Sequence, residues 1–222
     1  MARQTTTARA TKAANDDTPL PVGDSRTEII RAAARAFMVN GYAGSSIDMV
    51  ADELGCTKGR IYYQYKGKAD LFFDVQREAM RMNMAAVEPH AKAAGSPFER
   101  LRTMVEKQVV LIMEQQPFQR VLVQGVEMHL EGSTTPAQRE VLDLLIRQRD
   151  EYEQLFVKVV AEGVRKKEFR SLDPRIFCKV LLGSITWLTV WYRALDDDTP
   201  AKRQRLAREL ADYMLNGLGK GG

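Results

Sequence analysis

The chain has 222 residues, of which 45% are hydrophobic and 28% charged, and this balance is typical of a globular protein with a sizeable core. Its formal net charge of +4 is too small to indicate a nucleic-acid partner by itself. The longest apolar run, Val109–Met113, is too short for a membrane span, and no signal or transit peptide is recognisable. Two cysteines, Cys56 and Cys178, predict no disulfide framework. We therefore expect a cytoplasmic protein without a membrane partner.

Residues 1–23 combine Thr, Ala, Asp and Pro with almost no large apolar side chains, which predicts a disordered tail. Arg3, Arg9 and Lys12 make the beginning of this tail basic. The tail is either a solvated extension, which we favour, or an arm that contacts DNA.

The rest of the chain predicts helices only, because no alternating strand pattern bounded by hairpin turns occurs. Ser25 and Glu28 form a predicted capping box for the first helix, which should end at Asn40–Gly41. Four later helices should begin where a capping residue precedes a proline, at Ser96-Pro97, Thr135-Pro136, Asp173-Pro174 and Thr199-Pro200. The predicted helices span residues 25–40, 46–54, 57–65, 69–87, 97–115, 118–131, 136–167, 174–195 and 200–217.

These helices predict an all-α fold with two domains. Three short helices form a helix-turn-helix domain over residues 24–68. The longer and more apolar helices form a regulatory, effector-binding and dimerisation domain over residues 69–222.

The helix-turn-helix prediction depends on two short helices separated by Gly55-Cys56. In the first, which Ser45 or Ser46 can cap, apolar residues from Ile47 to Leu54 follow i, i+3, i+4 and i+7 spacing. Thr57 can cap the second.

On the second helix, Ile61 and Tyr65 lie one turn apart and should face inward. The opposite face then carries Gly59, Arg60, Tyr63 and Gln64, with Lys58 and Tyr62 beside it and Lys66 and Lys68 following. Arg can donate to guanine, Gln can pair with adenine, and tyrosine hydroxyls can hold phosphates. The alternatives are an ordinary solvated helix face or a basic helix for RNA or membrane.

Residues 26–72 resemble the N-terminal DNA-binding domain of the TetR family of transcriptional regulators. The resemblance is carried by an alanine-rich first helix that ends in Phe37, by Gly41-Tyr42, by Ser45-Ser46-Ile47 and by the segment TKGRIYYQYKGKADLF. Gln64 and Tyr65 depart from the family, which usually has histidine and phenylalanine there. The resemblance implies phosphate or base contacts for Ser46, Thr57, Lys58, Gly59, Arg60, Tyr62, Tyr63, Gln64 and Lys68.

The helices over residues 97–195 are apolar on more than one face. Polar and methionine side chains within them are either ordinary core or surface groups or, as a set, the lining of an apolar effector pocket. The candidates for this pocket are Met104, Gln108, Met113, Gln124, Met128, His129, Tyr152, Phe156 and Trp187.

The segment DPRIFCKVLLGSITWLTVWYR resembles the penultimate helix of TetR-type regulators, which with the last helix forms the dimer interface in that family. A core role without dimerisation is the alternative. The tryptophan-rich character is similar to that of members that respond to fatty acyl-CoA or other hydrophobic effectors. The candidates for the interface are Gly183, Ser184, Trp191, Leu206, Leu210, Tyr213 and Met214.

Signals for enzymatic chemistry are missing from the sequence. His90 and His129 lie at no zinc-ligand spacing, and no glycine-rich phosphate loop or nucleophile elbow occurs. We therefore expect no catalytic residue, metal or cofactor.

The sequence favours a ligand-responsive repressor that binds a palindromic double-stranded DNA operator as a homodimer. A small hydrophobic effector would release it from the operator. Two alternatives are an enzyme that kept an all-helical core and a helical scaffold or co-regulator whose helix-turn-helix binds protein.

Overall fold

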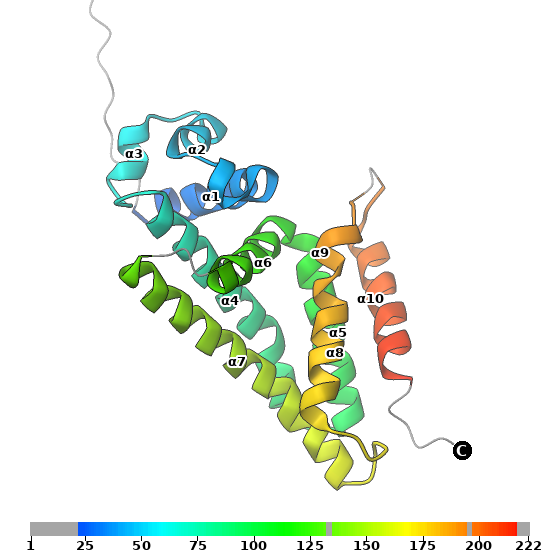
Figure 1. Ribbon diagram of the computed structural model, residues 1–222. Helices are drawn as coiled ribbons and strands as arrows, with labels where there is room; N and C mark the ends of the chain where they lie inside the picture. Colours follow the sequence, from blue (N-terminus) through cyan, green and yellow to red (C-terminus); the bar gives the residue numbers. More distant parts are fainter. Residues whose placement is uncertain (1–21, 132–134, 195–196, 217–222) are drawn as a thin grey trace, which may run out of the picture.

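The computed structural model describes residues 22–131, 135–194 and 197–216, and within these ranges every regular element is an α-helix (Figure 1). The predicted all-α class is therefore confirmed. Nearly all of the predicted tail lies outside the described residues. In chain order the helices are α1 Val22–Gly44, α2 Ile47–Leu54, α3 Lys58–Tyr62, α4 Lys68–Ala91, α5 Pro97–Glu114, α6 Gln116–Glu131, α7 Pro136–Arg165, α8 Pro174–Thr186, α9 Leu188–Trp191 and α10 Pro200–Leu215.

Helices α1, α2 and α3 form a small unit at one end of the molecule (Figure 1). Its core takes fully buried side chains from each helix, among them Phe37 of α1, Val50 of α2 and Ile61 of α3. The ring of Phe37 meets that of Phe72 of α4 edge to face, with centroids 5.1 Å apart. The core of the small unit thus continues into the first turns of α4.

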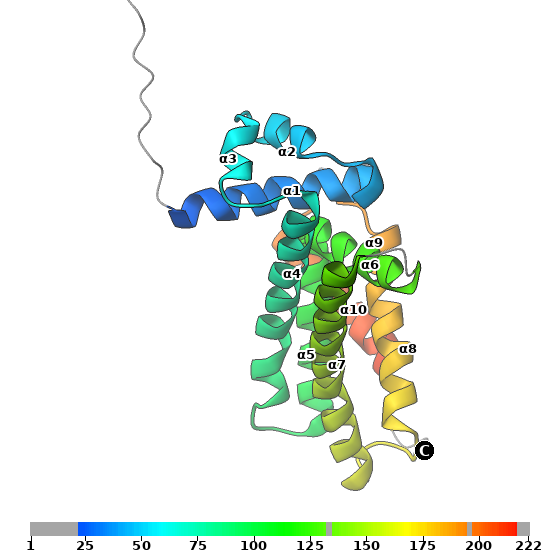
Figure 2. The same cartoon turned by 60° about the vertical axis from the view of Figure 1, so that its left-hand side comes forward.

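The remaining helices form a bundle below this unit. In Figure 2, α1 lies across the end of the bundle, in which α4, α5, α7 and α8 run alongside one another. Leu101 of α5, Phe156 of α7, Leu181 of α8 and Ala207 of α10 are buried in its core. Helix α4 packs against α1 as well as against α5 and α7, so it is shared by both parts of the molecule.

Local capping explains where α5, α7, α8 and α10 begin. Side-chain oxygens of Ser96, Thr135, Asp173 and Thr199 accept N–H groups of the first turns of α5, α7, α8 and α10, as the sequence predicted. Each is followed by a proline, which has no N–H that would remain unpaired there. None of the described helices combines the length and the hydropathy that crossing a bilayer requires.

Three sequence predictions about helices are wrong. Thr57 precedes α3, but its side chain makes no capping hydrogen bond. Ser25 does not cap the first helix, because α1 already begins at Val22 and Ser25 lies buried within it. The helix predicted over 174–195 is interrupted at Trp187, whose carbonyl accepts the N–H of Val190 at the tighter i+3 spacing (2.9 Å). The chain then becomes extended at Tyr192 (ψ 134°).

Candidate DNA-binding surface and effector cavity

The helix-turn-helix is built from α2 and α3. The hydroxyl of Ser46 accepts the N–H of Met49 (3.2 Å) and starts α2. Gly55 ends α2 with φ 62° and ψ 35°, a left-handed conformation that glycine adopts at little cost. Ile61 and Tyr65 are buried against α1 and α4, as predicted. The opposite side of α3 therefore faces solvent.

The exposed side of α3 presents aromatic and cationic groups. Tyr63 has 87% of its surface exposed, and Tyr62 is exposed beside it. Lys58 pairs with Asp48 of α2 (2.7 Å) at an exposed position, and this hydrogen bond and charge raise its pKa. Gly59 leaves open space where a Cβ would lie, apart from the Thr57 hydroxyl 3.7 Å away. Phenol, ammonium and hydroxyl groups next to an open backbone are suited to a DNA groove.

Arg60 and Gln64 are placed differently from the prediction, since both turn back toward α1. The Nε of Arg60 and the Nε2 of Gln64 each donate to the hydroxyl of Ser25, at 3.3 and 3.0 Å. Arg60 also pairs with Glu28. In this conformation both side chains hold α3 against α1 rather than project from the protein.

Lys68 begins α4 and is also directed inward. Its ammonium donates to the carbonyls of Tyr42 (2.8 Å), Ala43 (3.4 Å) and Ser45 (2.9 Å), and lies 4.5 Å from the centre of the Tyr42 ring. A lysine ammonium has three N–H donors. The predicted phosphate contact of Lys68 would require these bonds to be exchanged.

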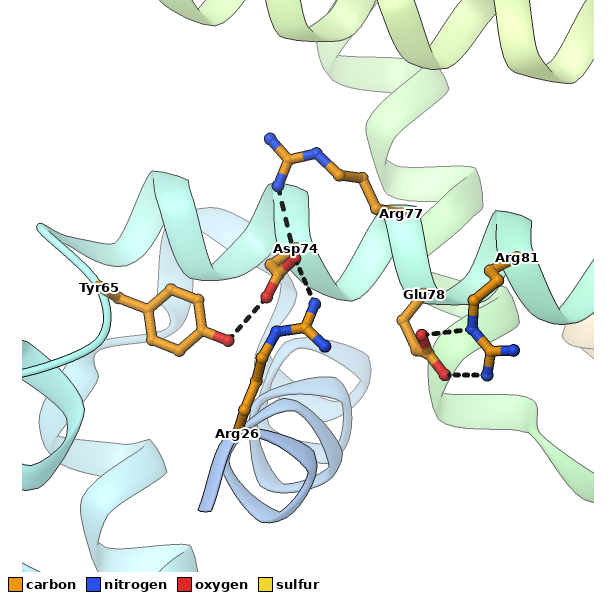
Figure 3. A network of polar contacts seen from close by, with 6 residues as sticks. All are labelled: Arg26, Tyr65, Asp74, Arg77, Glu78 and Arg81. Atoms are coloured by element: carbon orange, nitrogen blue, oxygen red, sulfur yellow. Dashed lines mark hydrogen bonds and ion pairs between the residues drawn. The ribbon is translucent and has the colours of Figure 1, made fainter. Parts of the chain in front are cut away.

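A buried carboxylate ties α1 and the segment after α3 to α4 (Figure 3). Asp74 of α4 accepts hydrogen bonds from Arg26 (2.8 Å) and from the hydroxyl of Tyr65 (2.7 Å). Burial alone raises the pKa of Asp74, but hydrogen bonds from Arg26 and Tyr65 and the charges of Arg26 and Arg77 outweigh it and lower that pKa. This network fixes the small unit on the helix that continues into the bundle.

A cavity of about 540 Å³ lies between α4, α5, α6, α7, α8 and the turn of α9. Its volume falls within the range of small-molecule sites. Apolar side chains such as Met80, Ile112, Leu142 and Ile185 form most of its wall.

The predicted pocket residues are only partly brought together. Gln108, Tyr152 and Trp187 line the cavity. Five others do not, so their assignment to the pocket is corrected. Met104, Met113 and Phe156 pack in the bundle core, Met128 packs against the core of the small unit, and Gln124 faces α1. The side chain of His129 lies outside the described residues, so its assignment stays a prediction.

Sequence reasoning missed the polar side chains that α4 and α6 contribute. Gln76, Asn83 and Gln119 are buried and line the cavity. On α4 Gln76, Met80 and Asn83 follow i, i+4 and i+7 spacing, and this signal could have placed them on one inward face. A Cβ on Gly125 would meet the amide of Gln76 at 2.3–2.5 Å, so this glycine makes room for Gln76.

Among the described residues no group of three or more His, Cys, Asp or Glu side chains is placed to hold a metal ion. Cys178 is buried in the bundle, where burial and the charge of Glu153 raise the pKa of its thiol to about 12. A thiol in this environment is unreactive at neutral pH.

Two family models match the chain. The model described as bacterial regulatory proteins, tetR family, matches residues 29–75, and the tetracyclin repressor-like C-terminal domain matches residues 94–218. The second match alone spans more than half of the chain. The chain belongs to the tetR family of bacterial regulatory proteins. It is therefore a helix-turn-helix regulator of transcription.

Individual TetR-family proteins are similar over nearly the whole chain. The HTH-type transcriptional repressor KstR2 of Mycolicibacterium smegmatis is 24% identical over 204 residues, which cover 91% of this chain and 94% of KstR2. The crystal structure of PfmR from Thermus thermophilus is 27% identical with a TM-score of 0.73, covering 88% of this chain and 98% of PfmR.

The structure of AibR, solved with isovaleryl coenzyme A and operator DNA, is 20% identical with a TM-score of 0.69, covering 89% and 100% of the two chains. This likeness shows the fold. KstR2 is named as a transcriptional repressor and PfmR as a transcriptional regulator.

The interface predicted from the TetR resemblance lies on α8, α9 and α10. Ile176 and Val180 of α8 and Trp187, which follows the last residue of α8, are exposed on one face, an arrangement unusual for a solvated surface. Of the seven candidates for the interface, Gly183, Ser184, Trp191 and Tyr213 are exposed, whereas Leu206, Leu210 and Met214 are partly buried and pack against the bundle core.

Proposed function

We propose that this TetR-family chain is a repressor that binds a palindromic operator as a homodimer and leaves the DNA when a small apolar effector occupies the cavity. The proposal depends above all on the exposed side of α3. There a phenol that is 87% exposed, Tyr63, stands beside Tyr62 and Lys58 on a helix whose other side is fixed in the core.

The exposed side of α3 suits the phosphates and bases of a major groove. Lys58 pairs with Asp48 near solvent, where such a pair contributes little and can be exchanged for a phosphate. The Thr57 hydroxyl makes no capping hydrogen bond and is available to donate. Ser46, Thr57, Lys58, Gly59, Tyr62 and Tyr63 are the proposed contact residues. In the free protein Arg60 and Gln64 position α3, and Lys68 holds the turn between α1 and α2.

In a homodimer each copy supplies one α3, and these two helices, the reading helices, each bind one half-site. Two helix-turn-helix units bind half-sites one turn of DNA apart, at about 34–36 Å. The exposed apolar face of α8, continued by Trp191 and Tyr213, is the proposed two-fold contact.

Effector binding is proposed to change the spacing of the two reading helices. Helix α4 lines the cavity and also carries Asp74, which holds Arg26 and Tyr65. Helix α6 lines the cavity as well, and the Nε2 of Gln124 donates to the carbonyl of Phe37 in α1 (2.9 Å). An effector shifts the population only if its affinities for the two spacings differ. The AibR complex with an acyl-CoA and operator DNA supports this combination of ligands.

Fluorescence anisotropy with DNA from upstream of the chain's own gene tests the proposal. The dissociation constant should rise steeply with salt, because DNA binding releases counterions. Lys58→Ala should reduce the slope of log K against log salt by about 1. Tyr63→Ala should weaken binding. The control Lys158→Ala, at an exposed position of α7, should change neither the dissociation constant nor the salt slope. Salt-independent binding, or no binding by the native chain, would contradict the proposal and favour a protein partner for the helix-turn-helix.

A further inference from the structure

We infer that two acidic side chains, Glu28 of α1 and Asp48 of α2, compete with DNA for the cations of α3 and thereby limit how tightly the chain binds DNA. This rests on the proposed function, because it takes α3 as the helix that contacts DNA. It also adds Arg60 to the DNA contacts, since this side chain becomes available once Glu28 is displaced.

Both cations of α3 form ion pairs with acids of the two neighbouring helices. The ammonium of Lys58 lies 2.7 Å from a carboxylate oxygen of Asp48, and the guanidinium of Arg60 lies 2.5 Å from one of Glu28. A carboxylate resembles a phosphate in its negative charge and in the hydrogen bonds that it accepts from Lys and Arg. Each pair therefore occupies a group of α3 that would otherwise bind a phosphate or a base edge.

The two pairs are exposed enough to be exchanged. Glu28 and Asp48 have 50% and 54% of their side-chain surface exposed. Arg60 is 27% exposed, and its Nε also donates to the buried hydroxyl of Ser25 (3.3 Å). Ion pairs near solvent contribute little to stability, because water and salt screen the charges. DNA, which presents a dense row of phosphates, can therefore displace both carboxylates.

A third ion pair of the small unit does not involve α3. Arg35 of α1 lies 2.6 Å from Glu53 of α2, and both side chains are exposed. This pair has the same chemical groups as the pair of Arg60 and Glu28. Glu53 is therefore a matched control for the loss of one negative charge from the small unit.

A limit on DNA affinity has a consequence for regulation. An effector releases the chain only if its affinities for the DNA-bound and the released conformations differ enough to offset the affinity for DNA. Because Glu28 and Asp48 weaken DNA binding, a smaller difference in effector affinity is sufficient. The two carboxylates thus determine how readily the operator is released.

Fluorescence anisotropy with a mixed-sequence duplex of about 30 base pairs tests the inference, since phosphate contacts require no particular sequence and this length accommodates two half-sites. Glu28→Gln and Asp48→Asn should each bind this duplex about threefold more tightly than the native chain. The double variant should bind about tenfold more tightly, because the two pairs share no residue. Glu53→Gln should change the dissociation constant by less than about twofold.

Two further backgrounds separate competition for a cation from plain repulsion of DNA by a carboxylate. In a chain that carries Arg60→Met, Glu28→Gln should tighten binding by less than about twofold, because no guanidinium is left to release. Asp48→Asn should behave in the same way in a chain that carries Lys58→Met. Circular dichroism should show the native helix content in every variant, since all of these side chains are at least partly exposed.

Unchanged or weaker binding by Glu28→Gln and Asp48→Asn would overturn the inference. A gain that Glu53→Gln reproduces, or that persists in the Arg60→Met and Lys58→Met backgrounds, would overturn it as well. The native chain, titrated with the upstream DNA, tests the proposed function separately. A native chain that prefers the upstream DNA but gains nothing from the two acidic substitutions would refute the inference alone, whereas no binding to either DNA would contradict both.

Discussion

At the scale of single residues, Lys68 shows that a cation in a DNA-binding domain can stabilise the fold through its own hydrogen bonds. It lies at the start of α4, and its ammonium reaches the carbonyls of Tyr42, Ala43 and Ser45 where α1 gives way to α2. Those carbonyls follow the break of α1 at Gly41 (φ 69°), and the carbonyl of Tyr42 also accepts the N–H of Ser45 (3.4 Å). Lys68 therefore stabilises the turn that sets the direction of α2.

Lys68→Met should lower the free energy of unfolding by about 1–3 kcal/mol, because part-buried carbonyls lose charged hydrogen bonds while the aliphatic stem is retained. Urea denaturation followed by circular dichroism measures the change. Lys66→Met, at the exposed neighbouring lysine, is the control and should stay within about 0.5 kcal/mol of the native chain. A Lys68→Met variant of native stability that binds all DNA sequences more weakly would show instead that Lys68 holds phosphate.

Residue roles could be predicted from sequence where neighbours along the chain determine them. The inward position of Tyr65 followed from helical spacing, and its burial confirms it. The role of Ser25 depends on Arg60 and Gln64, which are 35 and 39 residues away, and no local signal reports such a contact. Met104 and Phe156 lie on apolar faces, but periodicity cannot distinguish a packed core from a cavity wall.

At the scale of elements, Arg100 joins three helices at the end of the bundle away from α1–α3. Its guanidinium donates to the carbonyl of Ala91 at the end of α4 and pairs with Glu162 of α7 (2.8 Å). Hydrogen bonds from Lys166 and Arg100 lower the pKa of Glu162 from 4.5 to about 2. The contact therefore depends on an ionised Glu162.

The stability of this contact should be lost in acid. A carboxyl whose pKa is lower in the folded chain contributes its full stabilisation above pH 4.5 and loses it as the pH falls through about 2. Glu162→Gln, which cannot ionise, should show a shallower fall in unfolding temperature between pH 5 and pH 2 than the native chain. Glu151→Gln, at an exposed position of the same helix, should follow the native curve. Parallel curves for Glu162→Gln and the native chain would contradict this role.

The start of a helix could be predicted from sequence where residues close to it along the chain determine it. The cap and proline pairs at Ser96, Thr135, Asp173 and Thr199 fixed four helix starts, because capping involves only the next three residues. The interruption at Trp187 was missed, since nothing in the apolar pattern of residues 174–195 marks a break. Packing of the bundle, which buries Leu188 and Tyr192, decides it there.

At the scale of the whole molecule, the proposed operator contact, effector cavity and dimer contact share a few helices. Helix α4 extends from the α1–α3 unit into the bundle (Figure 2). There its residues line the cavity. Helix α8 has the cavity on one side and the exposed side chains of Ile176 and Val180 on the other, and Trp187 follows its last residue. Trp187 itself belongs to both surfaces. A ligand that moves α8 therefore changes the surface through which a second copy would attach.

Val180→Asp tests whether this surface joins two copies. Val180 is 65% exposed, so the substitution should leave the fold of one chain intact, whereas an unpaired carboxylate within an apolar contact opposes association. Sedimentation velocity at micromolar concentration should show a dimer for the native chain and a monomer for Val180→Asp. Operator affinity should fall with it, because one helix-turn-helix loses the half-site held by its partner.

The matched control is Val39→Asp, which places the same charge at a valine of α1 that is 73% exposed and should remain a dimer. If the native chain sediments as a monomer, or if Val180→Asp still forms the dimer, α8 is not the dimer contact of the proposed mechanism. Because two half-sites about 34–36 Å apart cannot be read by one copy, loss of the dimer with full operator affinity would contradict the palindromic operator as well.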